Sequence, residues 1–192
     1  ITLATAYPVP ITGQLTLSFG SDAFAPVDDP AIQFLTGGRT VNFTIPANTR
    51  QAVFPDGSSA IAFQTGTVSG VITFRATLRA LGEDITPTTP PPQSTVNIAP
   101  IAPVISDVTI KNVTDTSFEI VITGFSTPRQ LLQAMFVFNP MPNVQIQGAN
   151  AIQLDLSSVF STWYQSPASA QFGSQFTLHV PFTLSSGRRQ GL

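Results

Sequence analysis

The chain has 192 residues, of which 42% are hydrophobic and 9% are charged, and its formal net charge is −2 at pH 7. This balance excludes a nucleic-acid-binding role, because that role requires a basic surface to neutralise phosphates. The lack of cysteine excludes disulfides and thiolate metal sites, and no apolar run reaches the ~18 residues that a membrane-spanning helix needs.

A proline-rich stretch, residues 85–106, divides the chain into two halves. Residues 90–92 are consecutive prolines, which fix φ and lack backbone donors, so they predict an extended loop outside any sheet. After this loop, residues 94–98 alternate between polar and apolar side chains and predict the closing strand of a first domain. Pro100 and Pro103 then form a short, stiff hinge. We therefore expect a domain at residues 1–99, a second domain at residues 100–186, and a linker or tail at residues 187–192.

The first half contains short runs of period-two alternation separated by Gly, Pro, Asp and Asn turns. The longest run, residues 68–79, places Ile72, Phe74 and Leu78 on one face and predicts a central strand. No helical period is present, and turns recur about every ten residues, which is typical of an antiparallel β-sandwich. The other expected strands are residues 1–7, 13–20, 32–35, 40–45, 51–54 and 60–64.

The second half alternates in the same way, apart from one segment that is apolar on both faces. In this segment, residues 131–138, one face is core, and the other, with Met135 and Val137, needs cover from residues 156–165 or from another chain. Ser157 can cap a short helix that packs on the sandwich. We therefore expect an all-β fold of two tandem sandwiches, the second with one short helix. The other strands expected here are residues 102–110, 116–123 and 176–184.

Two phrases of the first half, residues 41–54 and 65–78, resemble the strand and turn phrases of bacterial immunoglobulin-like repeats, including the invasin type. Residues 102–110, with Gly124 and Phe125, resemble the start of the IPT/TIG immunoglobulin-like domains of bacterial surface proteins. The later phrases Phe-Ser-Thr-Pro-Arg-Gln and Trp-Tyr-Gln-Ser are similar to a family of uncharacterised C-terminal domains in bacterial secreted proteins, which implies no known chemistry. The resemblance implies two tandem immunoglobulin-like β-sandwiches of a secreted or cell-surface protein. Because the chain begins with isoleucine and has no signal-like segment, we expect a mature product or an excised piece.

Residues that support catalysis are scarce. His179, the only histidine, occupies an outward strand position, and the sequence singles out no nucleophile or acid beside it, so we predict no catalytic residues and no enzyme. Asp22, Asp28 and Asp29 supply oxygen ligands of the kind that calcium prefers, but their spacing matches no calcium loop, and Asp before proline also forms turns. We predict no metal and no cofactor, and calcium at residues 22–29 stays an alternative.

Two features of the sequence suggest contact with glycans. Asn42 and Asn112 each begin an Asn-x-Thr sequence, the acceptor pattern for N-linked glycosylation, although such matches also arise by chance in a Thr-rich chain. Trp163 and Tyr164 can form an aromatic platform for a sugar, although burial in the core is the more common role of such side chains.

The first residues of the chain suggest assembly. Residues 1–7 alternate, and native proteins rarely leave an apolar terminal strand of low charge unpaired. This strand can join the first sandwich, or it can add to the sheet edge of another copy. We therefore predict a structural or assembly module of an extracellular or cell-surface protein, such as a fibre subunit that self-assembles through β-strand addition. Its partners are then other copies of itself or other surface proteins, whereas the alternative is an adhesin or carbohydrate-binding module. The residues expected to take part in assembly are Ile1, Leu3, Tyr7, Met135 and Val137.

Overall fold

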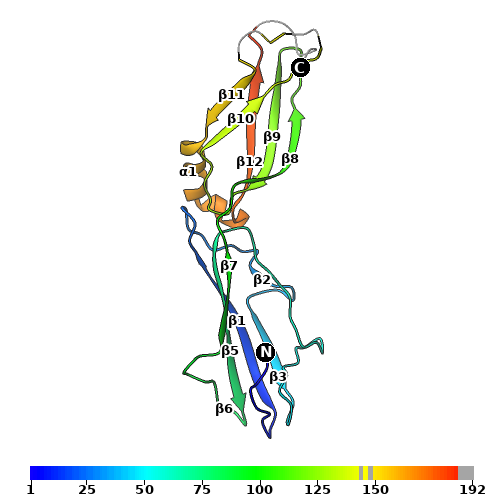
Figure 1. The fold of residues 1–192 in the computed structure, drawn as a ribbon, viewed down its shortest axis with the longest axis vertical. Coiled ribbons are helices and arrows are strands. Elements are labelled where there is room, and N and C mark those ends of the chain that lie inside the picture. The colour runs from blue at the N-terminus through cyan, green and yellow to red at the C-terminus, as the bar shows by residue number, and fades with distance from the viewer. Residues whose placement is uncertain (143–144, 147–148, 186–192) are drawn as a thin grey trace. The chain divides into compact units, whose positions relative to one another are not determined.

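The computed structural model describes residues 1–142, 145–146 and 149–185. These residues form mostly β-strands, together with one α-helix and one 3-10 helix (Figure 1). Every strand pair in the described part of the chain is antiparallel. The all-β class predicted from period-two alternation is therefore confirmed.

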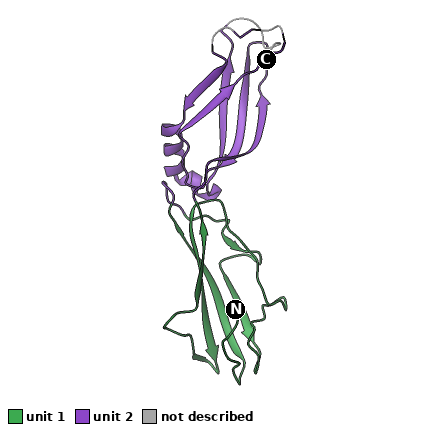
Figure 2. Ribbon diagram, viewed as in Figure 1, with its two compact units in different colours: residues 1–22, 28–99 green, residues 23–27, 100–192 purple. Residues whose placement is uncertain are grey.

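The chain divides into two compact units (Figure 2). The first contains residues 1–22 and 28–99, and the second contains residues 23–27 together with the chain from Pro100 onward. The expected first domain included residues 23–27, so the structure differs at this loop. Within the second unit, the Phe24 N–H donates to the Pro128 carbonyl at 3.0 Å, and Ala25 packs against the hydrophobic core. Local alternation carries no signal for such long-range contacts, because they depend on tertiary packing.

The main sheet of the first unit is built around two long strands, β1 and β5, which pair along their whole length. β3 pairs with the other edge of β1, and β6 and β7 both pair with β5, while β2 and β4 form a separate two-stranded sheet. The strands are β1 (Ile11–Ser21), β2 (Gln33–Phe34), β3 (Thr40–Ile45), β4 (Phe63–Gln64), β5 (Gly70–Ala80), β6 (Glu83–Asp84) and β7 (Gln93–Ile98).

Alternation along these strands decides which side chains form the core of the first unit. Ile11, Phe43 and Ile72 are almost completely buried on the inner face, and each such side chain contributes about 1.5–3 kcal/mol of hydrophobic free energy. Gly13 lies directly opposite Phe43, and a Cβ at this glycine would lie 2.2 Å from the phenylalanine ring. Gly13 is therefore needed for the close approach of that ring to the sheet. The outer face is polar, with Thr12 as one of its exposed side chains.

Several expected strands of the first unit are shorter than the alternation suggested. The strand expected at residues 51–54 is reduced to isolated bridges at Gln51 and Val53, and the strand expected at residues 32–35 is reduced to β2. In contrast, β5 covers most of the predicted central strand, and β7 contains the predicted closing strand. The long runs are placed correctly because many alternating residues agree, whereas four residues carry little signal.

The second unit contains a three-stranded sheet in the order β12, β9, β8 and a separate β10–β11 hairpin. β11 was not among the predicted strands. The elements are β8 (Val104–Lys111), β9 (Ser117–Phe125), β10 (Gln133–Val137), β11 (Ala151–Asp155), α1 (Ser157–Gln165), the 3-10 helix η1 (Pro167–Phe172) and β12 (Gln175–Thr183).

Helix α1 begins where the sequence predicts, but its first residue plays a different part. Ser157 is the first helical residue rather than the cap, and its N–H and hydroxyl both donate to the Asp155 carboxylate. Both hydrogen bonds hold the pKa of Asp155 below its usual value, and the bond from the Ser157 hydroxyl has the larger effect. Asp155 therefore satisfies a donor at the start of the helix that would otherwise need another acceptor.

Aromatic side chains fill the core of the second unit. The Phe182 ring on β12 contacts Phe136 of the hairpin and the following Phe138, with ring centroids 5.2 Å apart in both pairs. The Phe160 ring of α1 meets Phe176 of β12 edge to face at 5.3 Å. The hairpin and the helix thus cover β12, and Phe138 also reaches Phe118 on β9.

Candidate functional site

The strand β8 lies at one edge of its three-stranded sheet, in which β9 is the central strand and β12 is the other edge (Figure 1). Among the described residues β8 pairs only with β9, so within this part of the chain the N–H and C=O groups along its other side have no partner strand. Three apolar side chains of this strand are largely exposed, Ile105 at 60%, Val108 at 53% and Ile110 at 62%. Native proteins normally protect long apolar edge strands from such exposure.

The exposed side chains of β8 belong to the face of the sheet that forms the core. Val108 lies opposite Ile122, and Ile110 lies opposite Ile120. Directly opposite residues point to the same face of a sheet, and both β9 partners pack in the core of the second unit. The core face therefore continues onto β8, but the described aromatic contacts of the hairpin and α1 are made to β9 and β12. We call Ile105, Val108 and Ile110 the β8 apolar row.

The opposite face of β8 is polar and carries two opposite charges. Asp107, Thr109 and Lys111 follow one another on this face, with Thr123, Val121 and Glu119 of β9 as their respective cross-strand neighbours. A β-bulge lies between Ile105 and Asp107, and the Ser106 hydroxyl within it donates to the Thr123 carbonyl at 3.1 Å.

The N-terminal segment lies beside residues 50–52 of its own unit. The Leu3 N–H donates to the Arg50 carbonyl at 2.8 Å, and the Ala52 N–H donates to the Ile1 carbonyl at 3.1 Å. Leu3 packs against the core of the first unit, whereas Ile1 and Tyr7 are each 39% exposed. These contacts correspond to the alternative in which the segment joins its own unit. Strand addition to another copy through residues 1–7 stays a prediction.

Met135 and Val137 lie on the outer face of β10, where they are 69% and 53% exposed. Phe136, between them, is buried on the inner face. Helix α1 packs on the inner face, because its Phe160 and Tyr164 belong to the core cluster. Helix α1 therefore does not cover the apolar face that carries Met135 and Val137. Cover of this face by another chain stays a prediction.

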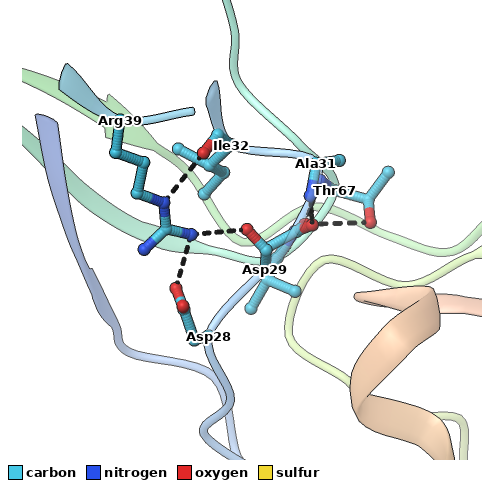
Figure 3. A network of polar contacts seen from close by, with 7 residues as sticks. Asp28, Asp29, Ala31, Ile32, Arg39 and Thr67 are labelled. Carbon is cyan, nitrogen blue, oxygen red and sulfur yellow. Dashed lines mark hydrogen bonds and ion pairs between the residues drawn. The ribbon is translucent and has the colours of Figure 1, made fainter. Parts of the chain in front are cut away.

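The acidic loop before β2 is held by hydrogen bonds within the first unit (Figure 3). Asp29 is 1% exposed, and its carboxylate accepts from the N–H groups of Ala31 at 2.9 Å, Thr67 at 2.7 Å and Val68 at 3.1 Å. Asp28 forms an ion pair with Arg39 at 2.7 Å. Both Asp29 oxygens and one Asp28 oxygen therefore already have protein partners.

The Nδ1 atom of His179 and the Oε1 atom of Glu119 lie 2.9 Å apart, within hydrogen-bond distance, and the contact is an ion pair only when the imidazole is protonated. The side chain of His179 is 56% exposed, and that of Glu119 is 18% exposed. The other carboxylate oxygen of Glu119 accepts from the Asn112 side-chain amide at 2.6 Å. The structure thus gives the histidine a carboxylate partner that the sequence did not single out.

The two candidate glycosylation residues are both exposed. Asn42 lies on the outer face of β3, where its side-chain carbonyl oxygen accepts from the Gln14 side-chain amide at 3.3 Å. Asn112 directly follows β8 and adopts a positive φ of 50°. Accessibility of the acceptor amide is the geometric requirement for modification.

A buried arginine that no sequence pattern indicated links residues 125–130 to residues 163–166. Arg129 is 2% exposed, and its guanidinium donates to the carbonyls of Gly173 and Tyr164 and to the Ser169 hydroxyl. It also lies 4.7 Å from the centroid of the Tyr164 ring, a cation–π contact. Burial raises the pKa of Tyr164 far above its usual value, and the Arg129 charge opposes this only in part.

Trp163 and Tyr164 do not form an exposed platform together. Tyr164 is 3% exposed, and its hydroxyl donates to the Ser174 carbonyl at 2.8 Å. Trp163 packs partly against the core, with its ring 6.1 Å from that of Phe172, which is 46% exposed. Trp163 and Tyr164 both lie on α1, and the sequence left open whether they are exposed.

A depression of about 580 Å³ lies on the outer face of the main sheet in the first unit. Polar side chains from three neighbouring strands line it, with Gln14 on β1, Asn42 on β3 and Thr77 on β5, and the charged Arg79 of β5 also lines it. These three residues occupy one cross-strand row, because Gln14 lies opposite each of the other two. Val53 and Pro55 supply apolar surface at the same depression. It therefore combines hydrogen-bonding groups with a small apolar wall.

Within residues 1–142, 145–146 and 149–185, no group of three or more His, Cys, Asp or Glu side chains is placed to hold a metal ion. None of the helices in the same residues is long and apolar enough to cross a membrane. Compared with protein-family models, with curated proteins and with solved structures, the chain shows no match.

Proposed function

We propose that this chain is a structural and assembly module of an extracellular or cell-surface protein, built from two tandem immunoglobulin-like β-sandwiches. Copies of the module associate by adding a strand to an open sheet edge, and this is how a fibre subunit would extend. The observation that supports the proposal is the β8 apolar row, which lies on the core face of an edge strand and is 53–62% exposed.

The energetic argument rests on the area that assembly would remove from water. About half of each of the three side chains of the row is exposed, and complete burial of such a side chain contributes about 1.5–3 kcal/mol. Complete cover of the row would provide about 2–4 kcal/mol per copy. A strand added at the edge flanks the row, so it gains part of this free energy together with the hydrogen bonds of strand pairing. Other copies or other surface proteins supply the added strand.

Sedimentation velocity over a range of concentrations, with negative-stain electron microscopy, tests the proposal. We expect association that weakens when Val108→Thr and Ile110→Thr are combined, because both changes keep a β-branched side chain but add a hydroxyl. The matched control combines Met135→Thr and Val137→Thr on the outer face of β10, which is similarly exposed. Association lost only in this control would move the contact to β10, and a monomer at every concentration would remove the proposal.

A second candidate function is carbohydrate binding, as an adhesin or a carbohydrate-binding module, and the depression on the first unit favours it. Amide and hydroxyl groups on adjacent strands can exchange hydrogen bonds with sugar hydroxyls, while Val53 and Pro55 can contact the apolar face of a sugar ring. A panel of immobilised glycans, probed with the natural chain and with Gln14→Ala, tests this function. We use Gln93→Ala on β7 as the control, because Gln93 is exposed but does not line the depression. Equal binding by both variants would contradict it.

A further inference from the structure

We propose that β8 pairs in antiparallel fashion with β8 of a second copy of this chain, about a twofold axis through Thr109. The proposal rests on the assembly function above and names the partner and register of one of its contacts. Because a twofold contact is complete with two copies, a fibre would need a second contact on another surface. Twofold association uses the same surface on both copies, so the surface must be complementary to itself. The sequence and geometry of β8 meet this requirement.

The part of β8 that can pair regularly is short and bounded on both sides. The bulge between Ile105 and Asp107 interrupts the ladder at one end. Asn112, with a positive φ of 50°, ends the extended backbone at the other. Residues 107–111 lie between these limits, and Thr109 is the middle residue of the five.

These five residues are self-complementary when the strand is reversed. Their order is Asp, Val, Thr, Ile and Lys, so in the antiparallel register centred on Thr109 the Asp107 of each copy lies opposite Lys111 of the other. Val108 of each copy likewise lies opposite Ile110 of the other. Opposite charges and pairs of β-branched residues are both favourable cross-strand neighbours.

The two faces of the sheet also match in this register. Val108 and Ile110 lie on the core face and Asp107 and Lys111 on the polar face of the same strand. Each copy therefore extends the apolar row of the other on one side and pairs charges on the opposite side. Among the described residues neither Asp107 nor Lys111 takes part in an ion pair, so both charges are available.

Neighbouring registers lose this complementarity. The two nearest antiparallel registers are centred on Val108 and on Ile110. The first places Asp107 opposite Thr109, and the second places Lys111 opposite Thr109. A parallel in-register pair would bring like charges together, which is unfavourable. The Thr109-centred antiparallel register is therefore the arrangement in which all four pairs around the axis are favourable, and its occupant is a second copy.

Charge reversal tests the register with the full chain. Asp107→Lys makes both charged positions basic, and Lys111→Asp makes both acidic, so each variant alone brings like charges together twice. We expect the dissociation constant of self-association, measured by sedimentation equilibrium, to rise at least about tenfold for each. An equimolar mixture of the two variants should associate again as a heterodimer. The double variant Asp107→Lys/Lys111→Asp should self-associate more tightly than either single variant, although Asp at position 111 also lies opposite Glu119 of its own chain.

A crosslink gives a second measurement that does not depend on the charge variants. The natural chain has no cysteine, so Thr109→Cys introduces one thiol at the proposed axis, where oxidation should link two copies rapidly. Thr177→Cys on β12, the other edge of the same sheet, is the control and should link slowly. Circular dichroism melts check that every variant is folded.

The outcomes separate this inference from the proposed function. A natural chain that assembles while the mixture of charge variants fails to associate overturns the β8 register and leaves assembly intact. A natural chain that stays monomeric at all concentrations overturns both. Rapid crosslinking at Thr177→Cys rather than Thr109→Cys would place the contact on the opposite edge and also overturn the inference.

Discussion

Replacing Asp29 by asparagine tests whether one buried carboxylate holds residues 28–32, the part of the loop before β2 that belongs to the first unit (Figure 3). One carboxylate oxygen accepts from the Ala31 N–H, and the other accepts from the N–H groups of Thr67 and Val68. Asparagine has nearly the same shape, but it offers one acceptor oxygen and one NH2 group. It can therefore serve only one of the two sides.

The size of the effect follows from these contacts. In the better orientation the asparagine oxygen faces Thr67 and Val68, and its NH2 group faces the Ala31 N–H, so two donors meet. A buried donor without an acceptor costs about 1–3 kcal/mol, and bonds to a neutral acceptor are weaker than bonds to a charged one. We expect the free energy of unfolding of the first unit to fall by about 2–3 kcal/mol, which lowers the urea midpoint by about 1 M or more.

Urea unfolding followed by circular dichroism and by tryptophan fluorescence provides the assay. Trp163 is the only tryptophan and lies in the second unit, so its transition should stay in place while the transition of the first unit moves. Asp28→Asn is the matched control, since the Asp28 side chain is 64% exposed and an exposed ion pair contributes only about 0–1 kcal/mol. Equal midpoints for Asp28→Asn and Asp29→Asn would refute the reasoning.

Three further predictions concern the second unit and the loop. Arg129→Lys should destabilise the second unit by about 2–4 kcal/mol, because lysine cannot reproduce the forked guanidinium bonds, and an unchanged Trp163 fluorescence transition would contradict this. The stability of the second unit should fall as pH rises above about 10, because burial raises the pKa of Tyr164 in the folded chain and the tyrosine therefore ionises first in the unfolded chain. Tyr164→Phe should remove this pH dependence, and a dependence that persists would point to another group. A chelator should leave both melting temperatures unchanged, because the Asp28 and Asp29 carboxylates already have protein partners, whereas a fall of many degrees would indicate bound calcium.

Local patterns in the sequence determined the class of the fold and the faces of its longest strands. Alternation along β1, β5 and β12 assigns inward and outward side chains without knowledge of any partner, because successive residues of a strand point to opposite sides. The prolines at residues 90–92 likewise predict a break in the sheet from their own geometry, and they lie between β6 and β7. These features depend on short-range steric effects, so the local residue types are enough to predict them.

Tertiary structure decided which polar residues are structural. Asp29 looks like a turn residue before proline, but its acceptors serve N–H groups of Thr67 and Val68, 38 and 39 residues further along the chain. Gly66 makes room for this contact, since its φ is +66° and a Cβ there would lie 2.5 Å from the Asp29 carboxylate. Arg129 is a similar case, because no local pattern predicts a buried guanidinium. Such contacts require two distant segments to be placed together, and a single sequence carries no separate signal for that.

Tertiary structure also decided where the fold is open. Alternation predicts that Val108 and Ile110 face the core, and they do share its face. Their exposure follows instead from the places of other elements, since β8 is at the edge of its sheet and the described hairpin and α1 contacts reach β9 and β12. A strand's own residues specify which side chains are apolar, but strand order and the covering layer depend on the packing of the whole unit.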